Sequence, residues 1–153
     1  MQGWLLLSHA GSTLFMTGLI WVIQVVHYPL FAGVGAAQFQ AYHHEHTRLI
    51  TLIVGPVMLV ELVSSVMLLA FKPEAVPAWL VWLGVVLVVV AWGSTAMLQV
   101  PAHNALASGL DPKMHGFLVH SNWLRTAAWT VRGALALWMI AMLMPPEVFT
   151  LSE

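Results

Sequence analysis

The stretch WLVWLGVVLVVVAWGSTAMLQV, residues 79–100, runs for 22 residues without a charged side chain. A helix of about 20 apolar residues spans the hydrocarbon core of a bilayer, which is roughly 30 Å thick. Three further stretches are comparably long and predominantly apolar: residues 4–27, 49–71 and 118–144. The sequence therefore predicts an all-α integral membrane protein with four transmembrane helices.

The bulk composition supports this prediction. Hydrophobic residues make up 60% of the 153 residues, charged residues only 7%, and the mean hydropathy is +0.87. Soluble domains do not have such a composition. Five Lys and Arg against six Asp and Glu provide no basic surface for nucleic acid. The absence of cysteine excludes disulfides, iron–sulfur clusters and thiolate metal sites.

Short connections between the four stretches predict a single domain, residues 1–153, folded as an antiparallel four-helix bundle. The connections 27–46 and 103–120 then lie on the same side. His27-Tyr28-Pro29 is expected to end the first span, because the residue before a proline resists the helical conformation. Residues 38–48 are expected to begin a helix that continues into the second span, and Pro101 to kink the exit of the third.

The orientation in the membrane follows from the distribution of basic residues. Arg48, Lys113 and Arg125 lie on the side of the two connections, against Lys72 on the other side. Because cytoplasmic loops carry the excess of Lys and Arg, this side is predicted to be cytoplasmic, in a bacterial inner membrane. The first span lacks a basic n-region and a cleavage site, so it is expected to stay in the membrane.

Seven of the eight histidines fall on that same side. They are His27, His43, His44, His46, His103, His115 and His120, whereas His9 lies towards the other side. Polar residues are costly in a membrane protein, so one-sided clustering indicates a functional site.

Polar residues also share faces of the predicted helices at a period of about 100° per residue. The stripes hold His9, Thr13, Met16, Ile20, Gln24 and His27 in the first span; His43, His46 and Glu61 in the second; Trp92, Thr95, Gln99 and His103 in the third; and Asn122, Arg125, Trp129 and Arg132 in the fourth. These stripes should face inward. Glu61 lies about 22 Å deeper than His46 and is expected to pair with Arg132 or His9.

The histidine-rich layer predicts a transition metal site for iron, copper or zinc, because neutral imidazoles bind all three. The predicted ligands are His27, His43, His46 and His103, with Glu45 as a candidate carboxylate ligand. The predicted hydrogen-bond partners of the imidazoles are Gln24, Gln99 and Asn122. The alternative, interfacial histidines that bind water and no cofactor, stays open.

The fourth span supplies the candidate catalytic residues Arg125, Asn122 and Trp123. Arg125 would bind an anionic group of the substrate, and Trp123 and Trp129 would line a flat apolar pocket. The structural alternatives are an arginine that reaches the lipid headgroups and tryptophans that fill the core.

The first half of the chain resembles the HemJ-type protoporphyrinogen oxidases, small helical membrane proteins that carry haem b. The resemblance covers about 60 residues and rests on His9, Gly18-Leu19, Tyr42, Arg48-Leu49, Pro56 and Met58. It implies His9 as a haem ligand. Glu45 occupies the position of that family's methionine, and the arginine of its Leu-Pro-Arg segment is missing, so ligation through that methionine is not implied.

The second half is similar to small four-span proteins that include fungal anthrone oxygenases. Their Pro-x-Asn-x-x-Leu motif corresponds to residues 101–106, PAHNAL, with His103 in place of the Asn. Their Trp followed by an Arg resembles Trp123 with Arg125 or Arg132. Both resemblances imply oxidation of flat, apolar, ring-bearing substrates inside a four-helix membrane bundle.

Three classes of function remain at this point. The first is a metal-dependent membrane oxidoreductase or oxygenase acting on a small apolar or aromatic substrate. The second is a haem b protein that transfers electrons or oxidises a porphyrin. The third is a non-enzymatic membrane subunit.

The predicted topology is testable by cysteine labelling. Single cysteines at Gly35 and Leu110 should react with a membrane-impermeant maleimide from the same side, because both lie in connections at the histidine-rich side. A cysteine at Ala75 should react from the opposite side. Labelling of positions 35 and 110 from opposite sides would contradict the antiparallel arrangement.

Overall fold

The computed structural model describes residues 2–145, and within this range the chain forms helices and turns but no strand. The elements are α1 Gln2–Val22, η1 Ile23–His27, α2 Tyr28–Leu30, η2 Phe31–Gly33, α3 Ala36–Phe71, α4 Ala78–Ser94, η3 Thr95–Gln99, α5 Val100–Leu106 and α6 Pro112–Ala141. Of the short elements, η1 and η3 are π-helical and η2 is a 3-10 helix.

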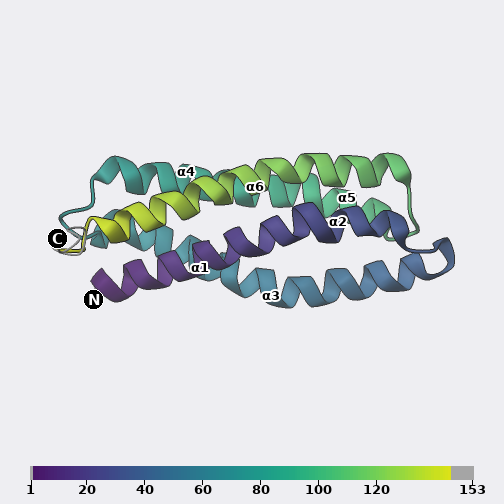
Figure 1. Ribbon diagram of the computed structural model, residues 1–153, viewed down its shortest axis with the longest axis horizontal. Helices are drawn as coiled ribbons and strands as arrows, with labels where there is room; N and C mark the ends of the chain where they lie inside the picture. The colour runs from purple at the N-terminus through teal and green to yellow at the C-terminus, as the bar shows by residue number, and fades with distance from the viewer. Residues whose placement is uncertain (1, 146–153) are drawn as a thin grey trace, which may run out of the picture.

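These elements form four continuous segments, which lie side by side in an elongated bundle (Figure 1). α1 packs against α3 and α6, and α4 packs against the same two helices. Successive segments run antiparallel, so η2 and α5 end at the same end of the bundle, which we call the histidine end. The predicted all-α, antiparallel arrangement of four helices is confirmed.

Three of the four segments are long and apolar enough to cross a membrane: Gln2–Gly33, Ala36–Phe71 and Ala78–Leu106. α6 has 30 residues but is not among them. Three of the four predicted spans thus have the length and the apolar composition that a membrane span requires. Large hydrophobic side chains nevertheless cover the outside of all four segments, including exposed Trp4, Leu52, Val89, Met97 and Leu137.

Two prolines at the histidine end produce π-helical turns. Pro29 has no N–H, and a proline ring crowds the carbonyl four residues earlier. The turn before Pro29 is widened, and the Tyr28 N–H donates to the Ile23 carbonyl. Pro101 follows a π-turn in the same register, where the Val100 N–H donates to the Thr95 carbonyl.

The prediction that the first helix ends at His27-Tyr28-Pro29 is therefore wrong. Tyr28 keeps helical angles, φ −64° and ψ −43°, and the segment continues to Gly33. The third segment likewise continues past Pro101 to Leu106. Each π-turn contains one extra residue, which rotates the side chains after it by about 100°. Tyr28 and His103 are among the rotated residues.

α3 begins at Ala36 and runs through Pro56 to Phe71, which confirms the predicted helix from residues 38–48 into the second span. α6 begins after Asp111, which caps the helix: its Oδ1 accepts a hydrogen bond from the Lys113 N–H at 2.9 Å. Pro112 follows in the first helical turn, where a proline is well tolerated.

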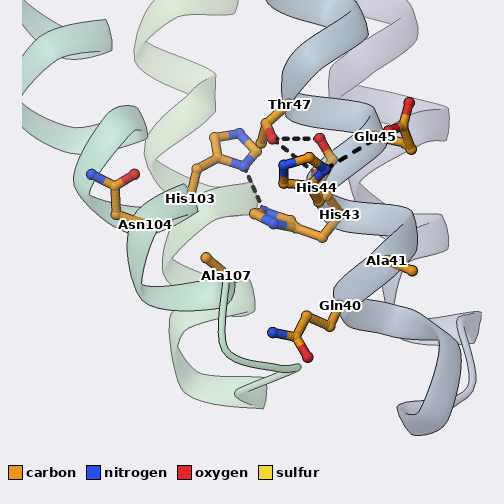
Figure 2. A pocket seen from close by; sticks show the side chains of 9 residues that line it. All are labelled: Gln40, Ala41, His43, His44, Glu45, Thr47, His103, Asn104 and Ala107. Carbon is orange, nitrogen blue, oxygen red and sulfur yellow. Dashed lines mark hydrogen bonds and ion pairs between the residues drawn. The ribbon is translucent and has the colours of Figure 1, made fainter.

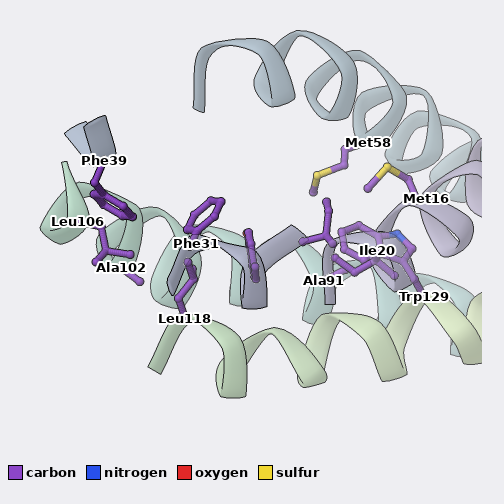
Figure 3. Close-up of a cluster of buried hydrophobic side chains, with 12 residues drawn as sticks. Met16, Ile20, Phe31, Phe39, Met58, Ala91, Ala102, Leu106, Leu118 and Trp129 are labelled. Carbon is purple, nitrogen blue, oxygen red and sulfur yellow. The ribbon is translucent and has the colours of Figure 1, made fainter. Parts of the chain in front are cut away.

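Two apolar clusters fill the bundle. One lies from its middle to the histidine end and includes Ile20, Phe31 and Trp129 (Figure 3). The other lies at the opposite end, around Leu68 and Leu80. Glu61 and Arg132 lie in the same interior and have almost no exposed surface. Their polar atoms therefore need partners within the protein, because water does not reach them.

Glu61 has no exposed surface and pairs with Arg132, one of its two predicted partners. The Arg132 Nε lies 2.9 Å from Glu61 Oε1, and Trp129 Nε1 donates to both carboxylate oxygens at 3.1 and 2.9 Å. Arg132 also donates to the Gly84 carbonyl. The other predicted partner, His9, instead lies 3.3 Å from the Ser64 hydroxyl through its Nδ1.

This ion pair predicts strong coupling between its two residues. Glu61→Gln or Arg132→Gln leaves one buried charge without its partner and should each cost about 3–5 kcal/mol. The double variant should lose clearly less than the sum. Unfolding in a denaturing detergent, followed by tryptophan fluorescence, measures these losses, with Glu74→Gln in the exposed turn as the control. Additive losses would contradict the pairing.

Candidate functional site

Four imidazoles meet at the histidine end: His27 from η1, His43 and His46 from α3, and His103 from α5. We call them the histidine cluster. They form two hydrogen-bonded pairs, His27 Nε2 with His46 Nδ1 at 2.8 Å and His43 Nε2 with His103 Nδ1 at 3.0 Å. The structure thus brings together the four predicted histidine ligands, from three of the four helical segments.

The spacing of the rings bears on metal binding. The measured separations between ring centres in the cluster range from 4.5 to 6.4 Å. A tetrahedral site with metal–nitrogen bonds of about 2.0–2.1 Å has imidazole centres roughly 5 Å apart. The nitrogens, however, face one another in pairs. Within residues 2–145, no group of three or more His, Asp or Glu side chains is arranged to hold a metal ion. Binding one ion would require the rings to turn.

One nitrogen of the histidine cluster lacks a partner. His46 Nε2 is buried and makes no hydrogen bond with any described residue. A buried polar atom without a partner costs about 1–3 kcal/mol, so such an atom marks a place where a ligand or ion can bind.

Sequence reasoning missed two residues that surround the cluster. The Tyr28 hydroxyl lies 2.9 Å from His103 Nε2, and the Tyr28 carbonyl lies 2.8 Å from His115 Nε2. Phe31 packs edge-on against His46, with 5.1 Å between ring centres. Tyr28 and Phe31 lie where the sequence predicts that the first helix has already ended. Their rings point inward only because the helix continues through this segment.

The predicted amide partners of the imidazoles are placed elsewhere. Gln24 donates to the Val119 carbonyl at 3.2 Å, and its Oε1 accepts from Asn122 at 2.7 Å. Gln99 donates to the Ser121 hydroxyl at 2.8 Å. The prediction that these three amides bond the histidines is wrong, because Gln24 and Gln99 donate to groups on α6, and Asn122 of α6 bonds to Gln24 and Arg125.

Arg125 is buried in this amide network, at 6% exposure. Its Nε donates to Asn122 Oδ1 at 2.9 Å and its Nη1 to the Thr95 hydroxyl at 3.2 Å. The guanidinium lies 5.6 Å from the centre of the Trp129 ring. Of the candidate catalytic residues, Arg125 and Asn122 therefore lie together in the interior.

Two other candidates do not join the site. Trp123 is 47% exposed and packs against Trp21 on the outside of the bundle, with 5.7 Å between ring centres. It follows Asn122 on α6, and consecutive helical residues point about 100° apart. Glu45 is exposed and pairs with Arg48 at 2.9 Å. Glu45 lines the outer pocket, and its carboxylate lies 3.7 Å from exposed His44. The structure therefore does not bring Trp123 to a substrate pocket or the Glu45 carboxylate to the rings of the histidine cluster.

The His43–His103 pair lies between two cavities. An outer pocket of about 510 Å³ between α3 and α5 is lined by Gln40, His43, Thr47 and His103 among others (Figure 2). A second pocket of about 480 Å³, which we call the inner cavity, is mostly apolar and opens to the surface beside Thr51 and Ala96. Its wall includes Tyr28, Val54, Met58, Trp92, Gln99, His103 and Arg125. His103, Thr47 and Asn104 line both.

No protein-family model, no curated protein and no solved structure matches this chain. Its function is therefore inferred from the residues themselves.

The contrast between neighbouring residues of α6 gives a test of this geometry. Asn122→Ala removes the partner of both Gln24 and Arg125 and should destabilise the protein by about 1–3 kcal/mol. Trp123→Ala removes an exposed side chain and should change stability by less, about 1 kcal/mol or below. Denaturation in detergent measures both. The reverse order of the two losses would contradict the described orientation of α6.

Proposed function

We propose that this chain is an integral membrane protein whose histidine cluster binds one transition metal ion, and that it is a metal-dependent oxidoreductase or oxygenase for an apolar substrate in the inner cavity. One observation carries the proposal. Four imidazoles from three helical segments converge beside an apolar cavity, and one of them has a buried nitrogen without a partner.

The membrane placement is supported by the outer surface. Three segments have the length and apolar character of a membrane span, and exposed hydrophobic side chains surround the bundle. α6 would be the fourth span. Its two arginines point inward, at 6% and 1% exposure for Arg125 and Arg132, so its lipid-facing side stays apolar.

The metal site is supported by the chemistry of the donors. Imidazole nitrogens are common ligands of iron, copper and zinc. The outer pocket would let a metal ion reach His43 and His103 from outside the bundle, because both side chains line it. Bound iron or copper would supply redox chemistry, whereas zinc would act as a Lewis acid. His103 would then be the link to the substrate, because it belongs to the cluster and lines the inner cavity.

Metal analysis of purified protein tests the proposal. The wild type should carry about one ion per chain, and the His27→Ala, His103→Ala double variant should lose most of it, since one ligand of each imidazole pair is removed. His44→Ala and His120→Ala, both at exposed positions, should keep it.

Three results would contradict the proposal. Full metal content in the double variant would show that the cluster is not the site. A Soret band in the absorption spectrum would identify haem b, the alternative for which His9 is the predicted ligand. Absence of both metal and haem from protein purified without chelator would favour a non-enzymatic subunit.

A further inference from the structure

We infer that the inner cavity binds an apolar molecule with a single anionic oxygen group, such as a carboxylate, and that Arg125 recognises this group. The inference names the substrate class of the proposed function. It rests on that function only for the claim that the bound molecule is oxidised. Binding itself depends only on the cavity.

The first observation is that Arg125 is a buried cation without an anionic partner. Among the described residues, the buried ion pair is Glu61–Arg132, and no Asp or Glu lies within salt-bridge distance of Arg125. Its hydrogen bonds go to neutral oxygens of Asn122 and Thr95. A buried charge paired only with neutral groups is unfavourable, and an anion that enters the cavity would compensate it.

The second observation is that two further polar atoms at the cavity have no partner. Trp92 Nε1 and Gln99 Oε1 are buried and unpaired among the described residues, and both side chains line the cavity together with Arg125. The unpaired Trp92 N–H is a donor, as is the guanidinium, whereas the Gln99 oxygen is an acceptor. A small rotation of the Trp92 ring would bring a second donor to the cavity beside Arg125, and two donors are suited to an oxygen that accepts hydrogen bonds.

The third observation concerns the body of the ligand. Below the polar wall, Ile50, Val54 and Met58 of α3 form an apolar wall that extends about 12 Å along the helix. The residues Thr51, Gly55, Ala96 and Val100 line the cavity and are also exposed at the bundle surface. At Gly55 an added Cβ would meet nothing within 4 Å. The cavity therefore opens sideways, where an apolar molecule dissolved in lipid would enter.

These observations together specify an amphiphile. A purely apolar ligand would leave Arg125 without an anionic partner and the Trp92 N–H without an acceptor, and a small inorganic anion would leave the apolar wall in contact with water. An apolar carboxylate satisfies both. Such a carboxylate is either a fatty acid or an aromatic acid. The two have different shapes but share the group that Arg125 would bind.

Binding to the full chain, purified in nonionic detergent and treated with a chelator to remove metal, tests the inference. The probes are laurate and 2-naphthoate, each compared with its neutral counterpart, dodecanol or 2-naphthol, by equilibrium dialysis. At least one acid should bind on the order of tenfold more tightly than its neutral counterpart, as expected for hydrogen bonds to a charged group. The tighter acid identifies the source. Equal affinity of both acids and their neutral counterparts would overturn the inference.

Two variants locate the site. Arg125→Gln should abolish the preference for the acid while leaving the neutral counterpart's affinity nearly unchanged, and retention of the preference would overturn the inference. Ala96→Phe fills the cavity and should block both probes, whereas Ala127→Phe, at an exposed position of α6 outside the cavity wall, should not. Undiminished binding in Ala96→Phe would overturn the inference even if Arg125→Gln fails to fold. The binding assay uses metal-free protein, so it is independent of the proposed metal site. If the acid binds but protein purified without chelator carries no metal, the proposed function is refuted and the present inference stands.

Discussion

Polar groups buried in an apolar bundle must find partners inside it, and this constraint acts most strongly on α6. Its buried face carries Asn122, Arg125, Trp129 and Arg132, and each is bonded to another helical segment or to a neighbour on α6. The same face explains why α6 is less apolar than the other three segments. α6 thus holds the interior together by hydrogen bonds and an ion pair, and not only by packing.

The two π-turns connect this face to the histidine end. Each contains one glutamine, Gln24 in η1 and Gln99 in η3, and each glutamine donates to a group on α6. The prolines that follow the π-turns therefore do more than bend their helices. They set the rotation of the segments that carry Tyr28 and His103, while the glutamines fix both segments to α6.

The sequence predicts much of this structure because its signals are periodic. Four apolar stretches give the helices and their antiparallel order, and the polar stripes correctly place the histidine cluster, Asn122 and Arg125 in the interior. Depth along the helices limits the partners of Glu61 to Arg132 and His9, of which the structure selects Arg132. The spacing of apolar and polar residues is enough to predict the helices and their inward faces, without knowing where each side chain points.

The failures come from local geometry that periodicity does not describe. A rule for residues before proline places a helix end at Tyr28, whereas a π-turn relieves the clash and lets the helix continue. The sequence predicts that the amides of Gln24 and Gln99 bond the histidines because they lie at a similar height in the bundle, but the π-turns direct both amides to α6. Glu45 shares its sequence segment with His43 and His46 and still faces outward, since it is rotated about 200° from His43 and about 100° from His46 around the helix.

The interior contains two polar layers: a lower layer with Glu61 and Arg132, and an upper layer with Asn122, Arg125 and the histidine cluster. Trp129 shows how these two layers differ in charge. Its indole N–H donates to Glu61, and its ring face lies beside the Arg125 guanidinium. Glu61 is already satisfied by Arg132 and by this N–H, so its charge is committed within the lower layer. The indole lies between that neutralised pair and the cation above it. Arg125 therefore keeps a net positive charge at the wall of the inner cavity, close to the histidine rings. The lower layer stabilises the bundle, and the upper layer is the one in which polar groups without partners remain for chemistry.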